Sequence, residues 1–452
     1  MGETVGPSSY FDPARIDSLE PATAALVRRR VEAMGPAYRL FYEEPVHFVR
    51  GAGVHLYDVD GVEYLDFYNN VASLGHAHPR VTSAIAEQAA VLNTHTRYLH
   101  EGIVRYAEDL LATMPDALGH VMVTCTGSEA GDLALRIAKH HTGGTGVIVT
   151  RNAYHGVTTE TAAISPSLVG QGSLPPWVRT VPAPDSYRVD PVALGYADLG
   201  EWFAAQVQDG IDDLAAHGIR LAALVVDTVF SSDGVFTEPR GFLAPARDVV
   251  RRAGGVLLAD EVQPGFGRSG DAMWGFQRHG TADSPFVPDL VTLGKPMGNG
   301  MPVAATVLTP EVVAEFGRDM RYFNTFGGNA VSVAAAQAVL DVVQEEHLQD
   351  NASRVGTGLR DSLRDLMATH PAIGDVRGAG LFLGVELVGA DGAPDEGLTL
   401  AVVNGLKRRR VLVATAGLEN DVLKIRPPLV ATDGDAERFV TELDATLTDL
   451  GR

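Results

Sequence analysis

The stretch Val291-Thr-Leu-Gly-Lys295-Pro-Met-Gly-Asn-Gly-Met-Pro302 decides how this chain is interpreted. It places one of only four lysines in an apolar, glycine-rich setting that follows a short run typical of a buried strand. Burial lowers the pKa of a lysine and leaves its amine free to act as a nucleophile. Lys295 is therefore a candidate for covalent catalysis, although from this stretch alone it could equally be described as an ordinary loop lysine.

A second apolar run, Gly255-Val-Leu-Leu-Ala-Asp260, ends in a carboxylate upstream of Lys295. Pyridoxal phosphate requires both groups: an anion opposite its ring nitrogen and an amine that forms a Schiff base with its aldehyde. The two residues together favour this cofactor, and the simpler alternative for Asp260 is a surface acid.

The bulk composition is that of a soluble globular protein. The chain has 452 residues, of which 45% are hydrophobic and 21% charged, so it can bury a large core in two or three domains. No apolar stretch approaches the roughly 20 residues that span a bilayer, and the polar N-terminus lacks the apolar core of a signal peptide. The single cysteine, Cys125, fits a reducing compartment and is expected in a buried strand. We therefore expect a cytoplasmic protein.

The charge of the chain limits its partners. A formal net charge of −21 argues against nucleic acid and anionic membranes, which require clustered cations, so small molecules are the expected partners. The stretch Gly75-His-Ala-His-Pro79 contains two histidines, but nothing nearby completes a ligand set. We expect no metal site there, and a turn that enters a helix explains the stretch.

Short runs rich in Val, Ile and Leu alternate with segments of helical periodicity through the middle of the chain, which is typical of an α/β domain with a mostly parallel sheet. The expected strands are Val121–Thr126, Val147–Thr150, Leu221–Val226, Val256–Ala259, Leu290–Leu293 and Ala304–Leu308. Helical patterns cover 132–141 and 243–253, and ligands collect at the carboxyl ends of such strands. The Pro- and Gly-rich region 165–198 is expected to be a long connection.

Both ends of the chain are expected to form a smaller α+β domain. A hairpin-like stretch occupies 48–66, and Asp375–Val388 and Val411–Ala414 are further strand candidates. We predict that residues 1–74 join the small domain, that 75–330 form the large cofactor-binding domain, and that 331–452 complete the small domain.

Three further segments could bind a phosphorylated, planar cofactor. Thr124-Cys-Thr-Gly127-Ser128 follows a strand and opens a helix, whose free amides suit a phosphate; the alternative is a plain helix start capped by Ser128 or Thr126. The pair Tyr154-His155 could place an aromatic ring against the cofactor, or simply pack. Thr325, in Asn324-Thr325-Phe326-Gly327, could donate to a phosphate or cap the next helix.

Read together, these segments resemble the class III aminotransferases, pyridoxal-phosphate enzymes of fold type I, from about Leu40 to Leu450. The motifs appear in the order typical of the family: Gly75-His-Ala-His-Pro79, Gly127-Ser-Glu-Ala130, Tyr154-His-Gly156, Asp260-Glu-Val-Gln263 with Gly265-Phe-Gly-Arg268, and Gly294-Lys295. The resemblance implies a large, mostly parallel, seven-stranded α/β/α domain with a smaller α+β domain built from both chain ends.

The resemblance also assigns roles by position. Lys295 would form the Schiff base and move the proton, and Asp260 would hold the ring nitrogen protonated. The implied cofactor-binding set is Gly127, Ser128, Tyr154, His155, Asp260, Val262, Gln263, Lys295 and Thr325. Thr325 would complete the phosphate site of a neighbouring subunit, which implies a homodimer with active sites at the interface.

The residues that would bind the substrate are less clearly indicated by the sequence than those that would bind the cofactor. Arg426, in Lys424-Ile-Arg426-Pro-Pro428, matches a position where many members bind a substrate carboxylate, and its alternative is a structural ion pair. Tyr68, Asn70 and Val71, together with Phe41, Tyr42 and Asn69, lie where the family builds its substrate pocket.

Within the family the chain is most similar to the ethanolamine-phosphate phospho-lyases and their bacterial relatives. The segments Asn93–His100, Gly294–Gly300 and Tyr322–Asn329 carry this resemblance. Three positions depart from the usual residues. Gly131 stands in place of an asparagine, and Met301 in place of the histidine frequent in that branch. Asp227 replaces the glutamate that transaminases use to pair a mobile arginine.

Three functions remain open from the sequence. The first is an aminotransferase that moves an amino group from an amine or amino acid to a keto acid. The second is a lyase that eliminates phosphate and ammonia from an O-phosphorylated amino alcohol, with Arg97 and Arg426 as candidate phosphate ligands. The third, a binding homologue without turnover, is disfavoured because both Lys295 and Asp260 are present.

Overall fold

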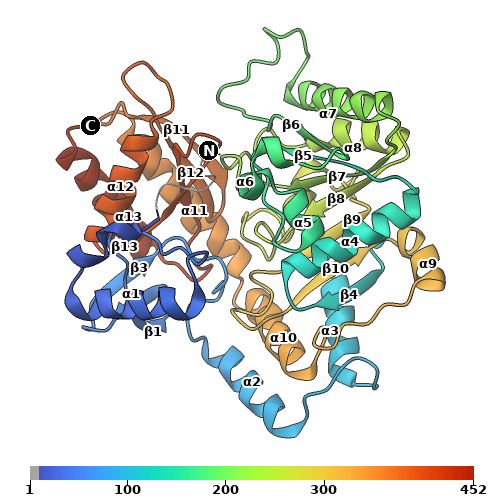
Figure 1. Ribbon diagram of the computed structural model, residues 1–452, viewed down its shortest axis with the longest axis horizontal. Helices are drawn as coiled ribbons and strands as arrows, with labels where there is room; N and C mark the ends of the chain where they lie inside the picture. The colour runs from blue at the N-terminus through green and yellow to red at the C-terminus, as the bar shows by residue number, and fades with distance from the viewer. Residues whose placement is uncertain (1–9) are drawn as a thin grey trace.

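The apolar runs in the middle of the chain form one seven-stranded sheet in the right half of Figure 1. The computed structural model describes residues 10–452. The sheet contains β4 (His120–Thr124), β5 (Gly146–Thr150), β6 (Val178–Val181), β7 (Leu221–Asp227), β8 (Val256–Asp260), β9 (Leu290–Leu293) and β10 (Ala304–Leu308). Their order is β4-β10-β9-β8-β7-β5-β6. Only β10 runs against its neighbours, so the predicted mostly parallel sheet is confirmed.

Apolar side chains of this sheet alternate between two cores, as the period of a strand requires. In β5, Val147 and Val149 face one core and Ile148 faces the other. The first core is closed by α4 (Gly127–Thr142) and α9 (Pro310–Asp319), and the second by α7 (Leu199–Ala216) and α8 (Leu243–Arg252). Helices on both faces leave the carboxyl ends of the parallel strands as the open edge where a ligand can reach the sheet.

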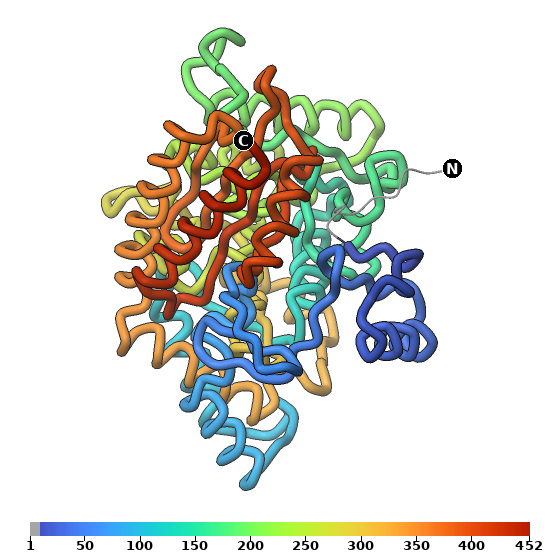
Figure 2. Tube along the Cα trace, turned by 90° about the vertical axis from the view of Figure 1, so that its left-hand side faces the viewer, coloured from blue at the N-terminus to red at the C-terminus, as the bar shows by residue number. Residues whose placement is uncertain are grey.

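The two ends of the chain pair with each other. The strands β1 (Phe48–Ala52), β2 (His55–Asp58), β3 (Glu63–Asp66) and β13 (Val411–Leu412) form one four-stranded sheet. A second contains β11 (Ile373–Ala379), β12 (Phe382–Leu387), β15 (Val422–Ile425) and β14 (Ala414–Ala416). Figures 1 and 2 show the blue N-terminal segment beside the orange and red C-terminal elements. This is the expected smaller α+β part; the boundaries after residues 74 and 330 stay predictions.

The remaining helices cover these sheets and line the lower end of the molecule in Figure 1. They are α1 (Pro21–Met34), α2 (Pro79–Val91), α3 (Glu101–Leu111), α5 (Thr159–Ala163), α6 (Pro166–Val169), α10 (Ala330–Glu345), α11 (Leu348–Leu366), α12 (Glu396–Arg408) and α13 (Asp433–Asp449). Short 3-10 turns occur at Pro13–Ser18, Gln171–Ser173 and Gly275–His279. No helix within 10–452 is both long and apolar enough to cross a bilayer.

Several expected elements differ in detail. The region 165–198 contains the edge strand β6, whose mixed sequence Val-Arg-Thr-Val lacks the continuous apolar run of a central strand. The candidate Asp375–Val388 is split into β11 and β12 by a turn at Gly380, where φ is +53°. The candidate Val411–Ala414 divides between β13 and β14, which belong to different sheets.

The expectation for Cys125 is wrong. β4 ends at Thr124, so Cys125 lies in the turn that follows, is only partly buried, and lines a cavity. Its backbone N–H donates to the Glu129 carboxylate at 2.7 Å, which holds the turn in place.

Candidate active site

A cavity of about 280 Å³ opens at the carboxyl ends of the parallel strands. Elements far apart in the sequence contribute to it: the start of α4, the turn after β5, and the ends of β7, β8 and β9. The predicted site residues that line it are Val71, Gly127, Ser128, Tyr154, His155, Asp260, Val262, Gln263 and Lys295. The structure therefore brings most of the expected cofactor site together, and the individual roles remain predictions.

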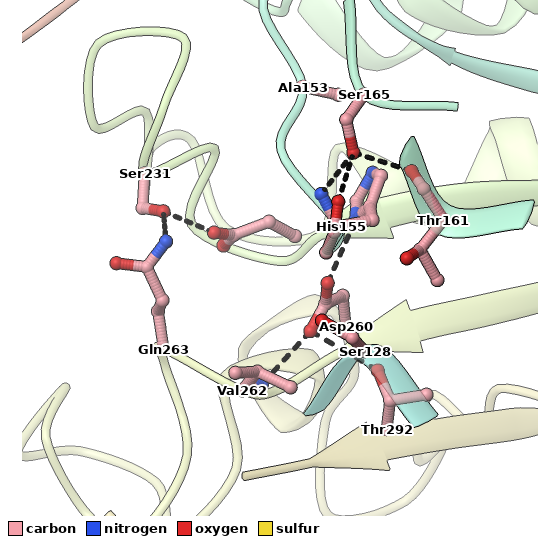
Figure 3. Close-up of polar contacts among 12 residues, drawn as sticks. Ser128, Ala153, His155, Thr161, Ser165, Ser231, Asp260, Val262, Gln263 and Thr292 are labelled. Atoms are coloured by element: carbon pink, nitrogen blue, oxygen red, sulfur yellow. Dashed lines mark hydrogen bonds and ion pairs between the residues drawn. The ribbon is translucent and has the colours of Figure 1, made fainter. Parts of the chain in front are cut away.

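Asp260 ends β8 and is fixed by three neighbours (Figure 3). The backbone N–H of Val262 and the hydroxyl of Thr292 donate to its Oδ1 at 3.0 and 3.1 Å. The His155 Nδ1 lies 2.7 Å from its Oδ2, and the Ser165 hydroxyl accepts from the His155 backbone N–H at 2.8 Å. A carboxylate with this many fixed contacts can present a negative charge to one atom with little reorganisation.

Lys295 lies directly after β9, at the same edge of the sheet. Burial, and then the nearby Arg426 charge, lower the pKa of its amine to about 8. The Lys295 Nζ lies 5.7 Å from the centre of the Tyr154 ring. A lysine with this pKa is partly neutral at physiological pH, as a nucleophile or general base must be.

The N-terminus of α4 faces the cavity. This segment is both a capped helix start and a possible phosphate site. Thr126 caps the helix in a capping box with Glu129, which was the structural alternative. Gly127 and Ser128 form the first turn and line the cavity, where helix amides suit an anion. A Cβ on Gly127 would lie 3.0 Å from Val262, and one on Gly156 would lie 2.6 Å from the Ser128 hydroxyl. A side chain at Gly156 would displace Ser128, and one at Gly127 would crowd Val262.

Arg426 belongs to a buried hydrogen-bond chain beside the cavity. Its Nη1 donates to Oε1 of Gln263, whose Nε2 donates to the Ser231 hydroxyl at 2.6 Å. Ser231 in turn donates to Asp227, whose pKa is raised by burial and by the neighbouring Asp260 charge. Arg426 is thus held through a neutral amide, and Asp227 is engaged with Ser231 and the Val229 backbone N–H.

Some of the other predicted substrate residues lie at or near the cavity, and others do not. The Tyr68 ring lies 4.3 Å beneath the Arg426 guanidinium, and Val71 lines the cavity. Asn70 is buried and its Nδ2 has no hydrogen-bond partner among the described residues. Thr325 and Arg97 are exposed and do not line this cavity. The Arg97 guanidinium lies 3.7 Å from the centre of the Phe323 ring, and its role as a phosphate ligand stays a prediction.

Sequence reasoning missed Lys424, which is 7% exposed and lies in β15 two residues before Arg426. Burial, and then the Arg426 charge, lower its pKa well below the ordinary value. Its position in a continuous apolar run, two residues before the predicted Arg426 site, could have drawn attention to it. Gly131 is explained by packing, because a Cβ there would lie 2.8 Å from Thr161. Met301 lines the cavity.

Comparison with known proteins identifies a family whose sequences resemble this chain. The sequence model of the class III aminotransferases matches residues 41–447. The chain belongs to the class III aminotransferase family. It is 39% identical to an alanine–glyoxylate aminotransferase 2-like protein of Drosophila melanogaster, over 93% of this chain and 86% of that one. This class III chain is therefore a pyridoxal-phosphate-dependent enzyme.

The structure is similar to solved structures of two enzymes with different activities. A phospholyase from Arthrobacter in complex with phosphoethanolamine superimposes with a TM-score of 0.88 at 41% identity, covering 94% of this chain and 99% of that one. An amine transaminase from an uncultivated Pseudomonas species, bound to pyridoxal phosphate, gives 0.80 at 29% identity, covering 90% and 95%. Both support the fold type I architecture.

The residues present fit pyridoxal phosphate. The glycine-lined start of α4 leaves room for a phosphate against the helix amides, and a buried carboxylate and a buried amine with a lowered pKa lie at the same cavity. The buried Nε2 of His155, whose Nδ1 lies beside Asp260, has no partner among the described residues. An amine, a carboxylate and an anion cradle in one cavity are the groups this cofactor needs.

Proposed function

We propose that this chain is a pyridoxal-phosphate-dependent lyase that eliminates phosphate and ammonia from an O-phosphorylated amino alcohol. The observation that carries the proposal is a pair of buried basic side chains, Lys424 and Arg426, of which Arg426 donates to the cavity-lining Gln263. Two residues apart on an extended chain, they point to the same side. Among residues 10–452, neither has a carboxylate within the 4.0 Å of an ion pair.

A guanidinium, together with an amine that can take up a proton when an anion binds, suits a doubly charged group better than the single carboxylate of an amino acid. Buried charges without a paired partner are costly, so they persist where a ligand neutralises them. The phosphate of an O-phosphorylated amino alcohol supplies that charge. Lys424 and Arg426 would hold this phosphate while it leaves.

The Asp227 carboxylate supports the same conclusion. A transaminase that alternates between two substrates needs an arginine that can move to and from an acidic partner. Here Arg426 donates to the neutral Gln263, and Asp227 is engaged by Ser231 and the Val229 N–H. Within residues 10–452, Arg426 therefore has no direct acid partner, which favours a single class of anionic substrate.

The cofactor would be held by residues from separate elements. Asp260 would bind the ring nitrogen, Val262 and Tyr154 would pack against the ring, and Gly127 and Ser128 would bind the phosphate. When bound, pyridoxal phosphate supplies an aldehyde that condenses with amines and a ring that withdraws electrons from the carbon next to nitrogen.

Lys295 would perform the proton transfer. Its neutral amine takes the proton from the substrate carbon that bears nitrogen. The bond from the neighbouring carbon to the phosphate oxygen then breaks, and the electron pair leaves on that oxygen. Arg426 and Lys424 stabilise the departing anion. Water completes the balance by releasing ammonia and an aldehyde.

A second candidate is an aminotransferase acting on an amine and a keto acid. The relative in Drosophila is named for that chemistry, and Arg426 is also suited to a carboxylate. Both candidates share the proton removal at Lys295 and would diverge afterwards: the lyase releases phosphate from the neighbouring carbon, whereas the aminotransferase transfers the amino group of the substrate.

Product analysis separates the two. The holoenzyme is incubated with excess O-phosphoethanolamine and no keto acid, and phosphate and ammonia are measured together. The lyase proposal predicts equal amounts of both over many turnovers. A reaction that stops after one turnover per enzyme molecule, or that needs a keto acid to continue, would rule out the lyase and favour the aminotransferase.

We also infer a homodimer. Residues 93–100 and 320–329 pack together through Arg97 and Phe323 and leave Tyr98, Leu99 and Phe326 exposed. Exposed aromatic and aliphatic side chains in one patch are typical of an interface. Thr325 lies in the same segment, in keeping with a role in the neighbouring subunit's phosphate site.

A further inference from the structure

The Asp260 carboxylate accepts hydrogen bonds from three groups, which lie on two sides of it in Figure 3. Its Oδ1 accepts from the Val262 backbone N–H at 3.0 Å and from the Thr292 hydroxyl at 3.1 Å. Its Oδ2 lies 2.7 Å from the His155 Nδ1, which carries the proton of this contact because an ionised carboxylate can only accept. Within residues 10–452, no other group donates to this carboxylate.

These contacts leave one place for a further donor. The two oxygens of a carboxylate together offer about four lone-pair sites. Val262 and Thr292 fill both sites on Oδ1, and His155 fills one of the two on Oδ2. The remaining site is therefore on Oδ2, and Asp260 lines the cavity in which a cofactor ring would lie.

The sheet itself fixes the position of the Thr292 hydroxyl. Thr292 is paired with Asp260 in the parallel register of β8 and β9, and its side chain is buried. The backbone N–H of Glu261 donates to the Thr292 carbonyl at 2.9 Å, next to the side-chain contact. Threonine is branched at Cβ and has few rotamers, so its hydroxyl keeps one direction. Thr292 does not line the cavity, and its hydroxyl can therefore act on a cofactor only through Asp260.

We propose that Thr292 is a positioning residue, whose hydroxyl occupies Oδ1 of Asp260 and thereby directs the ring nitrogen of the cofactor to Oδ2. The same hydrogen bond stabilises the charged carboxylate, since a carboxylate with fewer donors competes more strongly for a shared proton. Thr292 thus helps to keep the proton on the ring nitrogen, where it increases the electron withdrawal of the ring. The inference rests on the proposed function for the role of Asp260, and it holds for a lyase and an aminotransferase alike.

The test compares two cofactors by titration of the apoenzyme: pyridoxal phosphate, and an analogue with a C–H group in place of the ring nitrogen. Thr292→Val removes the hydroxyl and keeps the shape of the side chain, and Thr292→Ser keeps a hydroxyl. Thr306→Val is the matched control. Thr306 is paired with Thr292 from β10, is buried, and donates its hydroxyl to the Ala130 carbonyl at 2.8 Å.

Thr292→Val should bind pyridoxal phosphate about tenfold more weakly, the usual effect of losing a hydrogen bond to a charged group. Its affinity for the analogue should change by no more than about twofold, because Thr292 is coupled to a ring nitrogen that the analogue lacks. Thr292→Ser should bind both cofactors like the unmodified protein. Any loss caused by Thr306→Val should be equal for the two cofactors.

A nuclear magnetic resonance measurement on the holoenzyme, with the cofactor isotopically labelled at its ring nitrogen, checks the position of the proton. In Thr292→Val the nitrogen resonance should move towards that of an unprotonated ring, and in Thr306→Val it should stay in place. An unmoved resonance in Thr292→Val would reject the effect on the proton.

Two binding results would overturn the inference: an equal loss of both cofactors in Thr292→Val, which marks a structural role, or unchanged binding of both. Thr292→Ala also lacks the hydroxyl and repeats the test if valine disturbs the fold. Asp260→Asn tests the proposed function separately, because it should weaken pyridoxal phosphate more than the analogue. An equal loss in Asp260→Asn would reject the role of Asp260, whereas a selective loss there without one in Thr292→Val would reject only this inference.

Discussion

Lys295 has a lowered pKa for two separable reasons. Burial is the larger cause and the positive charge of Arg426 the second, while Asp260 and Asp227 oppose them. A positive neighbour favours the neutral amine, because the protonated form would place two like charges together. The reactivity of the lysine therefore depends on a residue that the proposal also assigns to the substrate.

Replacing Arg426 with glutamine should raise the pKa of Lys295, since a repelling charge is lost. The rate at which apoenzyme captures pyridoxal phosphate, trapped with cyanoborohydride, should rise with pH through a midpoint near 8 in the unmodified protein. In Arg426→Gln the midpoint should move to higher pH. Arg318→Gln, an exposed charge remote from the cavity, should behave like the unmodified protein. An unmoved or lower midpoint in Arg426→Gln would contradict this electrostatic account.

Gly156 is a second residue whose identity the structure requires. Its φ is +139°, and a Cβ there would lie 2.6 Å from the Ser128 hydroxyl and 2.7 Å from that of Thr161. Gly156→Ala should lower the free energy of unfolding by roughly 1–3 kcal/mol and weaken cofactor binding by displacing Ser128. Gly358→Ala, in α11 with nothing within 4 Å, should gain about 0.5–1 kcal/mol. Urea denaturation and cofactor titration measure both. Equal behaviour of the two variants would refute the packing argument.

At the scale of elements, β15 contains a buried lysine that we expect to lower the stability of the fold and to contribute to ligand binding. Lys424 lies within this strand, where burial lowers its pKa well below the ordinary value. A lysine with a lowered folded pKa binds its proton more weakly than the unfolded chain does. Stability is therefore lost as pH falls below the ordinary lysine pKa.

Lys424→Met should raise the melting temperature by a few degrees at pH 7, and the gain should shrink at pH 9.5, where the unfolded lysine begins to lose its proton. The same variant should bind 2-aminoethylphosphonate at least about tenfold more weakly, because a buried charge on the ligand loses its partner. Thermal melts at both pH values and a cofactor titration test this. Lower stability with unchanged binding would show that Lys424 is structural.

The elements of the large sheet were predictable because their strands are continuous runs of Val, Ile and Leu. β6 was not, since an edge strand that is half exposed has no such run. The location of Lys295 and Asp260 at one edge of the sheet was predictable from the apolar runs that precede them, and their roles stay predictions. Lys424 and Ser231 were not, because their neighbours in the site come from distant parts of the chain and only the folded structure brings them together.

At the scale of the whole molecule, the surface made by 93–100 and 320–329 carries the expected subunit contact. Leu99 is fully exposed there and Phe326 is 70% exposed. Leu99→Asp should convert the expected dimer to a monomer and weaken cofactor binding, because Thr325 lies on the same surface. Sedimentation velocity and cofactor titration measure both effects. Leu418→Asp, another exposed leucine outside this surface, should leave the assembly unchanged. A dimer that persists in Leu99→Asp would place the interface elsewhere.

The proposed reaction of this class III enzyme is the expulsion of phosphate from its substrate. The most direct measurement follows cofactor absorbance and free phosphate in one cuvette after O-phosphoethanolamine is added without a keto acid. We expect continuous phosphate release while the cofactor returns to its starting spectrum. Complete conversion of the cofactor to its amine form, with no phosphate released, would contradict it and establish the chain as an aminotransferase.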